Sequence, residues 1–279
     1  MNNERFEQTW STRSEKNYVH WTKGDPKNQI QLAFRKHWET FREIMANSQE
    51  SIGRRVLEVG CGRGSLSAYF AESGYDCTLL DISPSVIDAA KKSFADNELK
   101  AEFTVGDAFN LPYQESVFDI VFSIGLFEHF EDVKRLLQEQ IRVLKSGGLF
   151  IAYIVPEYSN NIQTQYEWMN QVLKCVSVMT DNDAGTKPSV FRTKYRAGHY
   201  THILKKMPVK GIQSSGIYPL PMISTSIEFP FTLLPPSGEE VLVSTFLKML
   251  EERARKTHHN PWLCREGYGQ ASLVWCVKE

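Results

Sequence analysis

The sequence predicts an α/β protein with a Rossmann-like, doubly wound and mostly parallel sheet. Strand-like apolar runs alternate with helix-like segments from about residue 56 to residue 156, and this alternation is typical of parallel strands joined by right-handed crossovers. A glycine-rich turn at 60–64 joins the first strand to the first helix. Acidic residues stand at or near the carboxyl ends of the first two strands, the edge where open α/β sheets bind ligands.

The individual elements follow in chain order. The expected strands cover 56–60, 77–81, 101–105, 118–124 and 149–155, and the expected helices cover 65–73, 84–95 and 132–144. The last of these helices has one apolar stripe that we assign to the core, made of Val133, Leu136, Leu137, Ile141 and Leu144. Gly147 and Gly148 are expected to end it. Further on, a helix near 199–207 is expected to precede a strand at 209–217.

The chain divides into four expected parts: an N-terminal helical cap, an alternating core, a lid insertion, and a C-terminal part that completes the sheet with substrate-side elements. Their bounds are 1–52, 53–156, 157–195 and 196–279. The cap is expected to contain a helix because four large apolar residues keep helical spacing, namely Ile30, Phe34, Trp38 and Phe41. The insertion interrupts the alternation and is rich in Tyr, Trp, Met and Asn, which we interpret as a lid over a substrate.

Composition and charge narrow the class of partner. The chain has 279 residues, 42% of them apolar, and can bury a sizeable core. Its 32 basic and 33 acidic residues nearly balance, so we expect a small-molecule acceptor and no nucleic-acid partner. The five cysteines form no CxxC pair, which predicts reduced thiols, a cytoplasmic protein and no metal site. No apolar run reaches the roughly 20 residues that span a bilayer, so no membrane insertion is expected; monomer and homodimer both remain open.

The turn after the first strand has the composition of a nucleoside-binding loop. Gly60, Gly62 and Gly64 alternate with larger residues, and residues without a Cβ allow close approach of a ligand and permit positive φ. Asp81 closes the second strand, where an acid can accept hydrogen bonds from ribose hydroxyls. A nicotinamide coenzyme fits less well, because the spacing is GxGxG instead of GxGxxG and no second mononucleotide-binding half follows.

Further motifs extend this pattern. Val-Gly-Asp-Ala stands at 105–108, Phe-Asp-Ile-Val-Phe-Ser-Ile-Gly-Leu-Phe-Glu-His at 118–129, and Arg-Val-Leu-Lys-Ser-Gly-Gly at 142–148. Together with the glycine loop and Asp81, these motifs resemble the class I S-adenosylmethionine-dependent methyltransferases, closely so over about residues 54–155. The resemblance implies S-adenosylmethionine as cofactor and S-adenosylhomocysteine as product. It also identifies the run at 272–278 as an antiparallel last strand.

The resemblance implies a set of cofactor contacts. The glycine loop and the acid before it would lie along the methionine and ribose, the acid after the second strand would bind the ribose, and the residues after the third strand would face the adenine. The end of the fourth strand would touch the methionine, and the segment before the first strand would close over the site. The implied residues are Tyr18, Trp21, Glu58, Gly60, Cys61, Gly62, Gly64, Asp81, Ile82, Asp107, Ala108, Ser123, Ile124 and Gly125.

Residues on the acceptor side carry less specific signals. His129 at the sheet edge and His199 on an expected helix are the predicted general bases, and a structural role stays open for each. A free amine acceptor would need no strong base. The many aromatic side chains of the lid and of 217–231 predict an apolar acceptor pocket, with contacts from Trp168, Tyr195 and Tyr200.

The expected function is methyl transfer to an oxygen, nitrogen or carbon atom of a small, partly apolar molecule by direct in-line displacement, with secondary metabolism as one setting. One alternative is a regulatory module that binds the cofactor without turnover. Another is a lipid-modifying enzyme, because the string at 123–130 also resembles cyclopropane fatty acid synthases. The strand at 150–154 lacks the histidine expected for the bicarbonate site of that family.

Overall fold

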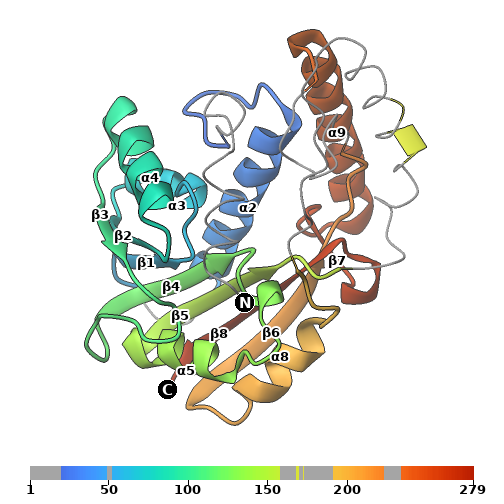
Figure 1. Cartoon of the computed structure of the whole chain (residues 1–279). Helices are drawn as coiled ribbons and strands as arrows, with labels where there is room; N and C mark the ends of the chain where they lie inside the picture. Colours follow the sequence, from blue (N-terminus) through green and yellow to red (C-terminus); the bar gives the residue numbers. More distant parts are fainter. Residues whose placement is uncertain (1–19, 49–51, 158–167, 170–171, 173–190, 223–233) are drawn as a thin grey trace.

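The computed structural model describes residues 20–48, 52–157, 168–169, 172, 191–222 and 234–279. Its core is a sheet of eight strands in the order β3-β2-β1-β4-β5-β8-β6-β7 (Figure 1). In chain order the strands are β1 (Arg55–Val59), β2 (Asp76–Asp81), β3 (Glu102–Val105), β4 (Phe118–Ile124), β5 (Leu144–Ile154), β6 (Val209–Ile217), β7 (Leu263–Cys264) and β8 (Ala271–Lys278).

Strands β1 to β5 pair in parallel, with Val59 opposite Leu80 and Glu58 opposite Phe122. Strand β8 lies between β5 and β6 and runs antiparallel to both. The two-residue β7 pairs antiparallel with β6 at the sheet edge. The predicted fold class is confirmed: the sheet is mostly parallel and its last strand is antiparallel.

Helices cover both faces of the sheet, so the fold is doubly wound (Figure 1). Residues from four helices join the apolar cluster on one face and residues from two join the cluster on the other. The first four are α2 (Gln29–Ala46), α3 (Ser65–Glu72), α4 (Pro84–Asp96) and α9 (Pro236–Thr257), and the other two are α5 (Lys134–Val143) and α8 (Ala197–Leu204). Among the helices of the described residues, none is both long enough and apolar enough to cross a membrane.

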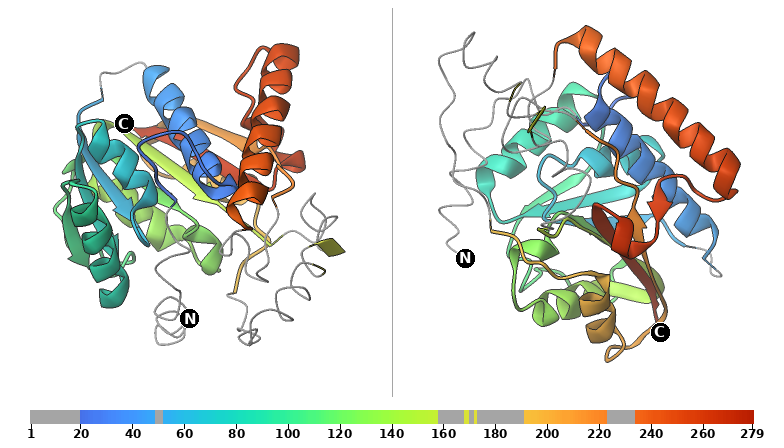
Figure 2. Two further views of the ribbon diagram at one scale, coloured as in Figure 1. Left: turned by 90° about the horizontal axis from the view of Figure 1, so that it is seen from above. Right: turned by 90° about the vertical axis from the view of Figure 1, so that its right-hand side faces the viewer.

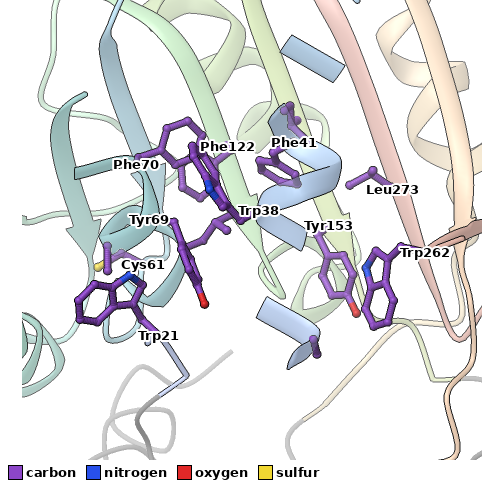
Figure 3. Packing of buried hydrophobic residues seen from close by; sticks show 14 of the residues in the cluster. Trp21, Trp38, Phe41, Cys61, Tyr69, Phe70, Phe122, Tyr153, Trp262 and Leu273 are labelled. Carbon is purple, nitrogen blue, oxygen red and sulfur yellow. The ribbon is translucent and has the colours of Figure 1, made fainter. Parts of the chain in front are cut away.

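Helix α2 covers the middle of the sheet and lies beside α9 (Figure 2). The Asn28 side chain caps its first turn by accepting a hydrogen bond from Gln31 N at 2.8 Å. Its apolar stripe packs inward: the Trp38 ring lies 4.7 Å from that of Phe70, which stacks on Phe122 of β4 at 5.2 Å (Figure 3). These contacts fix α2 and α3 over the first and fourth strands.

The structure differs from the expected elements in three places. Helix α5 ends at Val143 without a glycine, because Leu144 is already extended (ψ 138°) and begins β5. Gly147 and Gly148 therefore lie within β5, where the pairing with β4 is irregular. The second correction is α9, a 22-residue helix between β6 and β7 that the sequence patterns did not predict. The helix expected near 199–207 begins and ends earlier, as α8.

The order of the strands places a topological switch point at the carboxyl ends of β1 and β4, and we call this place the crevice. Strands β1 and β4 are neighbours, yet the chain leaves β1 toward β2 and leaves β4 toward β5. The connecting helices α3 and α5 pack on opposite faces, so the loops that follow the two strands diverge. Ligands of open α/β sheets bind at such a switch point, and the predicted cofactor loop lies there.

Candidate functional site

The loop after β1 has the backbone conformation that its glycines predict. Gly60, Gly62 and Gly64 all have positive φ, at 69°, 54° and 68°. The N–H groups of Gly60 and Cys61 both donate to Leu80 O, at 2.8 and 2.9 Å. The loop is therefore fixed to the end of β2, and it leads directly into α3, whose N-cap is Gly64.

The three glycines meet different surroundings. A Cβ on Gly64 would lie 2.2 Å from Leu79 Cδ2, and one on Gly60 would lie 2.8 Å from Leu126 Cδ1. A Cβ on Gly62 would meet no described atom within 4 Å. Gly60 and Gly64 are thus required by packing, whereas Gly62 borders open space in which a ligand can lie against the backbone.

Asp81 joins the loop to the end of β2. Its Oδ2 accepts a hydrogen bond from Gly62 N at 3.0 Å, and its Oδ1 accepts one from Ser83 N at 3.1 Å. The side chain is buried, and burial raises the pKa of this carboxyl. Because each carboxylate oxygen has two lone pairs, Asp81 can hold the loop and still accept hydrogen bonds from a diol.

Glu58, the acid of β1, makes its contacts inside the protein. Its Oε2 accepts hydrogen bonds from the Ser67 backbone N–H at 3.3 Å and from the Ser67 hydroxyl. Desolvation by burial raises the pKa of Glu58 to about 8. The structure thus shows Glu58 linking β1 to the first turn of α3.

Two exposed apolar side chains stand at the ends of β2 and β3. Ile82 is 38% exposed and Val105 is 50% exposed, and their strands pair with Asp81 opposite Val105. Asp107 follows, and its Oδ1 accepts a hydrogen bond from Phe109 N at 2.9 Å, while Ala108 packs against the apolar cluster on the α5 face. Val105 was missing from the predicted set, although its place at the end of a strand is visible in the sequence.

The N-terminal segment reaches the glycine loop through Trp21. This side chain is buried in the same cluster as Cys61, and its ring lies 6.3 Å from that of Tyr69. Figure 3 shows Trp21 next to Cys61. Tyr18, the other residue predicted to close the site, lies outside the described residues.

The end of β4 forms the other side of the crevice. Ser123 and Ile124 are its last residues, and Gly125 follows with a φ of 68°. Gly125 N donates to Tyr153 O of β5 at 2.9 Å. The Ser123 hydroxyl is buried and has no hydrogen-bond partner among the described residues.

The turn after β4 is attached to the two ends of the predicted lid. His129 lies in the 3-10 turn η2 (Phe127–His129), and its Nδ1 donates to Phe191 O at 2.8 Å. The backbone N–H of Thr193 donates to Glu128 O at 2.7 Å, and that of Glu157 donates to Thr193 O at 2.9 Å. Both ends of the insertion therefore meet at the crevice, and the Nδ1 of His129 is engaged in holding them.

A cluster of aromatic and imidazole rings joins α2, β5 and the segment before β7. The Trp262 indole N–H donates to His37 Nδ1 at 3.1 Å, and the His37 ring lies 4.4 Å from that of Tyr153. Burial lowers the pKa of His37 to about 3, so this imidazole stays neutral with its proton on Nε2. The sequence analysis missed His37 and Trp262, because 225 positions separate them and no local pattern connects them.

Two of the three predicted acceptor residues, Tyr195 and Tyr200, contact the ring of the predicted base His199. Trp168 is 62% exposed, and Tyr195 stacks on His199 with ring centroids 3.9 Å apart. Tyr200 is only 1% exposed and packs 5.8 Å from Phe127 in the α5-face cluster. Tyr200 therefore packs toward the sheet from α8, and its contact with the acceptor stays a prediction. Residues 158–167, 170–171 and 173–190 of the lid and residues 223–233 lie outside the described residues.

No cluster of three or more metal-ligating side chains occurs in the part of the chain that the structure describes.

Comparison with known proteins shows what the middle of the chain resembles. Residues 57–152 match a family model described as a methyltransferase domain. This segment contains the glycine loop, Asp81 and the end of β4.

Two curated relatives share this region. Ajmaline N-methyltransferase of Rauvolfia serpentina is 38% identical over 102 residues, which are 35% of this chain and 35% of the relative. Chloroplastic tocopherol O-methyltransferase of Arabidopsis thaliana is 31% identical over 140 residues, which are 46% of this chain and 40% of the relative. The match thus spans less than half the length of either relative.

One solved structure resembles the fold over its whole length. Magnesium protoporphyrin IX methyltransferase of Synechocystis PCC 6803, described with bound SAH, aligns over 100% of both chains with a TM-score of 0.54 and 15% identity. At that identity the likeness concerns the fold alone. Residues 57–152 are thus similar to a methyltransferase domain, and the chain as a whole shares the fold of this methyltransferase structure.

Proposed function

We propose that this protein binds S-adenosylmethionine in the crevice between β1 and β4 and transfers its methyl group to a small, partly apolar molecule. The observation that carries this proposal is the open space beside Gly62, whose positive φ and missing Cβ leave the backbone accessible. Asp81 stands next to it with both oxygens fixed by backbone N–H groups. The residues present therefore fit a nucleoside cofactor.

The residues take different parts in holding the cofactor. Asp81 accepts hydrogen bonds from the ribose hydroxyls, and Ile82 and Val105 provide apolar surface for the adenine, which explains their exposure in the cofactor-free protein. Asp107 and Ala108 face the base. The methionine portion lies between the glycine loop and the end of β4, with Glu58 holding the loop's helix in place.

The bound cofactor supplies a sulfonium-activated methyl group, so the protein's own work is positioning and exclusion of water. Trp21 lies beside Cys61 of the glycine loop, and Tyr18 is the other residue proposed to close the site. The insertion leaves and re-enters the fold at the crevice, through the hydrogen bonds of Thr193 and His129, and this placement supports its role as a lid. Trp168 and Tyr195 are the proposed acceptor contacts on this side.

The matched relatives act on small molecules according to their names, an N-methyltransferase of ajmaline and an O-methyltransferase of tocopherol. They support transfer to nitrogen or oxygen, and the former supports a setting in secondary metabolism. His129 and His199 remain the proposed general bases of the sequence analysis. A cyclopropanating activity has less support, because β5 has Tyr153 and no histidine at its carboxyl end.

The proposal is tested by titrating S-adenosylhomocysteine into the purified protein in a calorimeter. The wild type should bind it, and Asp81→Ala should weaken binding by about 1.5 to 3 kcal/mol, the range for a hydrogen bond to a charged group. Asp119→Ala is the matched control, because Asp119 accepts from Arg55 N and contacts Lys145 at the start of β4, far along the strand from the crevice. That variant should lose stability and keep its affinity.

An assay for S-adenosylhomocysteine release then separates an enzyme from a binding module. Release in the presence of an acceptor supports the enzyme, whereas binding without release across amines, phenols and carbon acids supports the regulatory alternative. Equal affinities for wild type and Asp81→Ala would remove Asp81 from the site.

A further inference from the structure

A buried carboxyl group outside the predicted site lies at the carboxyl end of β4. Glu128 is only 1% exposed. A Cβ built on Gly125 would stand 3.4 Å from Glu128 Oε1, so the carboxyl group lies directly against the strand end that borders the crevice. Its Oε2 is buried and has no hydrogen-bond partner among the described residues. An oxygen buried in this way costs folding free energy.

Structural carboxyl groups in this protein are satisfied differently. Glu239 is as deeply buried, at the start of α9. Its Oε2 accepts from Gln29 N at 2.9 Å, and its Oε1 accepts from Gln29 Nε2 at 3.0 Å and from Leu234 N at 2.9 Å. Both oxygens of Glu239 are therefore used to join α9 to the first turn of α2. The Glu128 carboxyl interacts with the backbone N–H groups of its own residue and of Val155, but its Oε2 has no partner among the described residues. This oxygen therefore does not join two elements as those of Glu239 do.

The groups around Glu128 belong to the elements that enclose the crevice. The charged and titratable side chains that face it are His129 of its own turn, Arg192 of the segment after the insertion, and Tyr153 of β5. Burial raises the pKa of the Glu128 carboxyl, and the neighbouring His129 and Arg192 side chains and the backbone N–H groups of Glu128 and Val155 oppose this shift. A carboxyl group with a raised pKa holds a proton better near neutral pH, which suits a general base.

We propose that Glu128 binds the acceptor, accepting a hydrogen bond from its nucleophilic N–H or O–H and taking up that proton during methyl transfer. This inference rests on the proposed function and narrows it to nitrogen or oxygen acceptors that carry a proton. The acceptor's lone pair forms the new bond to the methyl carbon, while the bond from that carbon to sulfur breaks and its electron pair remains on sulfur. The proton passes from the acceptor atom to the Glu128 carboxylate, so charge and atoms balance.

The first test compares the melting temperatures of Glu128→Gln and Glu239→Gln in the cofactor-free protein. Glu128→Gln should melt within about 2 °C of the wild type or above it, because no hydrogen bond to Oε2 is lost. Glu239→Gln should melt at least about 4 °C lower, because an amide N–H would face backbone donors. Glu239→Gln thus gives the drop in melting temperature that follows the loss of a structural buried carboxylate in this fold.

The second test measures S-adenosylhomocysteine affinity by calorimetry and methyl transfer to three probes, tryptamine, aniline and catechol. Glu128→Gln should bind S-adenosylhomocysteine within about twofold of the wild type, while kcat falls at least about 100-fold. The acidic limb of the wild-type pH profile should disappear in the variant. A residue with a purely structural role would not separate cofactor affinity from turnover in this way.

Each other outcome has a defined meaning. Unchanged turnover in Glu128→Gln overturns the inference and leaves the proposed function intact. A lower melting temperature for Glu128→Gln, comparable to that of Glu239→Gln, also overturns it by showing a structural role. Absence of S-adenosylhomocysteine binding by the wild type overturns the proposed function itself. If the wild type methylates none of the probes, the two melting temperatures decide.

Discussion

At the residue scale, the three glycines of the loop after β1 share a backbone conformation but differ in the space that a side chain would have. All three have positive φ, which costs a residue with a Cβ roughly 1 kcal/mol or more. Gly60 and Gly64 also lack room for a side chain, because Leu126 and Leu79 lie too close. At Gly62 the positive φ is the only feature among the described residues that favours glycine. If a side chain at this position also weakens cofactor binding, the reason is contact with the ligand.

Gly62→Val should therefore weaken cofactor binding beyond its effect on folding. Gly211 in β6 is the matched control, because it has a φ of 62° and no described atom lies within 4 Å of the place that a Cβ would take. Valine at either site should lower the free energy of unfolding by a similar amount. Calorimetry should show at least a tenfold weaker Kd for S-adenosylhomocysteine, about 1.4 kcal/mol, in Gly62→Val alone. Equal losses of affinity in both variants would contradict the loop assignment.

Glu58 gives the molecule a pH dependence with a defined sign. Its pKa is about 8 in the folded protein, against an ordinary value of 4.5, so the folded state binds more protons than the unfolded state between these values. Stability should be greatest at the acidic end and fall by on the order of 1 kcal/mol per pH unit as the pH rises toward 8. Burial of Asp81 acts in the same direction.

Urea unfolding of the cofactor-free protein between pH 5 and 8 checks this prediction. Glu58→Gln keeps a neutral group next to Ser67. Its free energy of unfolding should fall less steeply with rising pH than that of the wild type, and the remaining decline should come from Asp81. Identical slopes for the two proteins would show that Glu58 ionises without penalty in the folded state.

At the element scale, the sequence patterns determined the parallel half of the sheet better than the C-terminal half. Strands β1 to β4 and helices α3 and α4 follow from local alternation and glycine turns. The boundary between α5 and β5 was misplaced because Leu144 fits the helical stripe as well as a strand. Helix α9 was missed although Val243, Phe246 and Leu250 keep helical spacing after two prolines.

Two aromatic residues near the insertion differ in exposure, and substitution of each should therefore have a different effect. Tyr200 of α8 is buried against Phe127, so Tyr200→Ala should lower the free energy of unfolding by about 3 kcal/mol or more, the cost of a large cavity. Trp168 is mostly exposed, so Trp168→Ala should leave stability within about 0.5 kcal/mol and raise the KM of the acceptor. Urea unfolding and steady-state kinetics check both. A large loss of stability in Trp168→Ala would place it in the core instead of the acceptor site.

At the scale of the whole molecule, the candidate site combines residues that local patterns reveal with residues that only the tertiary fold brings together. The glycine loop, Asp81 and the end of β4 were visible because each follows a strand directly. The aromatic cluster was not, since His37 of α2 meets Tyr153 of β5 and the distant Trp262 only in the folded protein. Nor does any sequence pattern show that Glu128 is buried with an oxygen left unpartnered. Long-range packing therefore decides the acceptor side, whereas local sequence decides the cofactor side.

The position of the proposed cofactor site predicts how strongly a bound ligand stabilises the whole fold. The proposed cofactor site lies at the ends of β1, β2 and β4 in the middle of the sheet, so a ligand there should bind the native state and not the unfolded chain. S-adenosylhomocysteine at 100 times its Kd should then stabilise the protein by about 2.7 kcal/mol, which corresponds to a rise in Tm of roughly 5 °C or more. At the same concentration the rise should persist in Gly211→Val and shrink strongly in Gly62→Val, because only the latter loses affinity. Thermal melts with and without the ligand measure this directly, and a wild-type Tm that stays constant up to millimolar S-adenosylhomocysteine would rule out the crevice as its binding site.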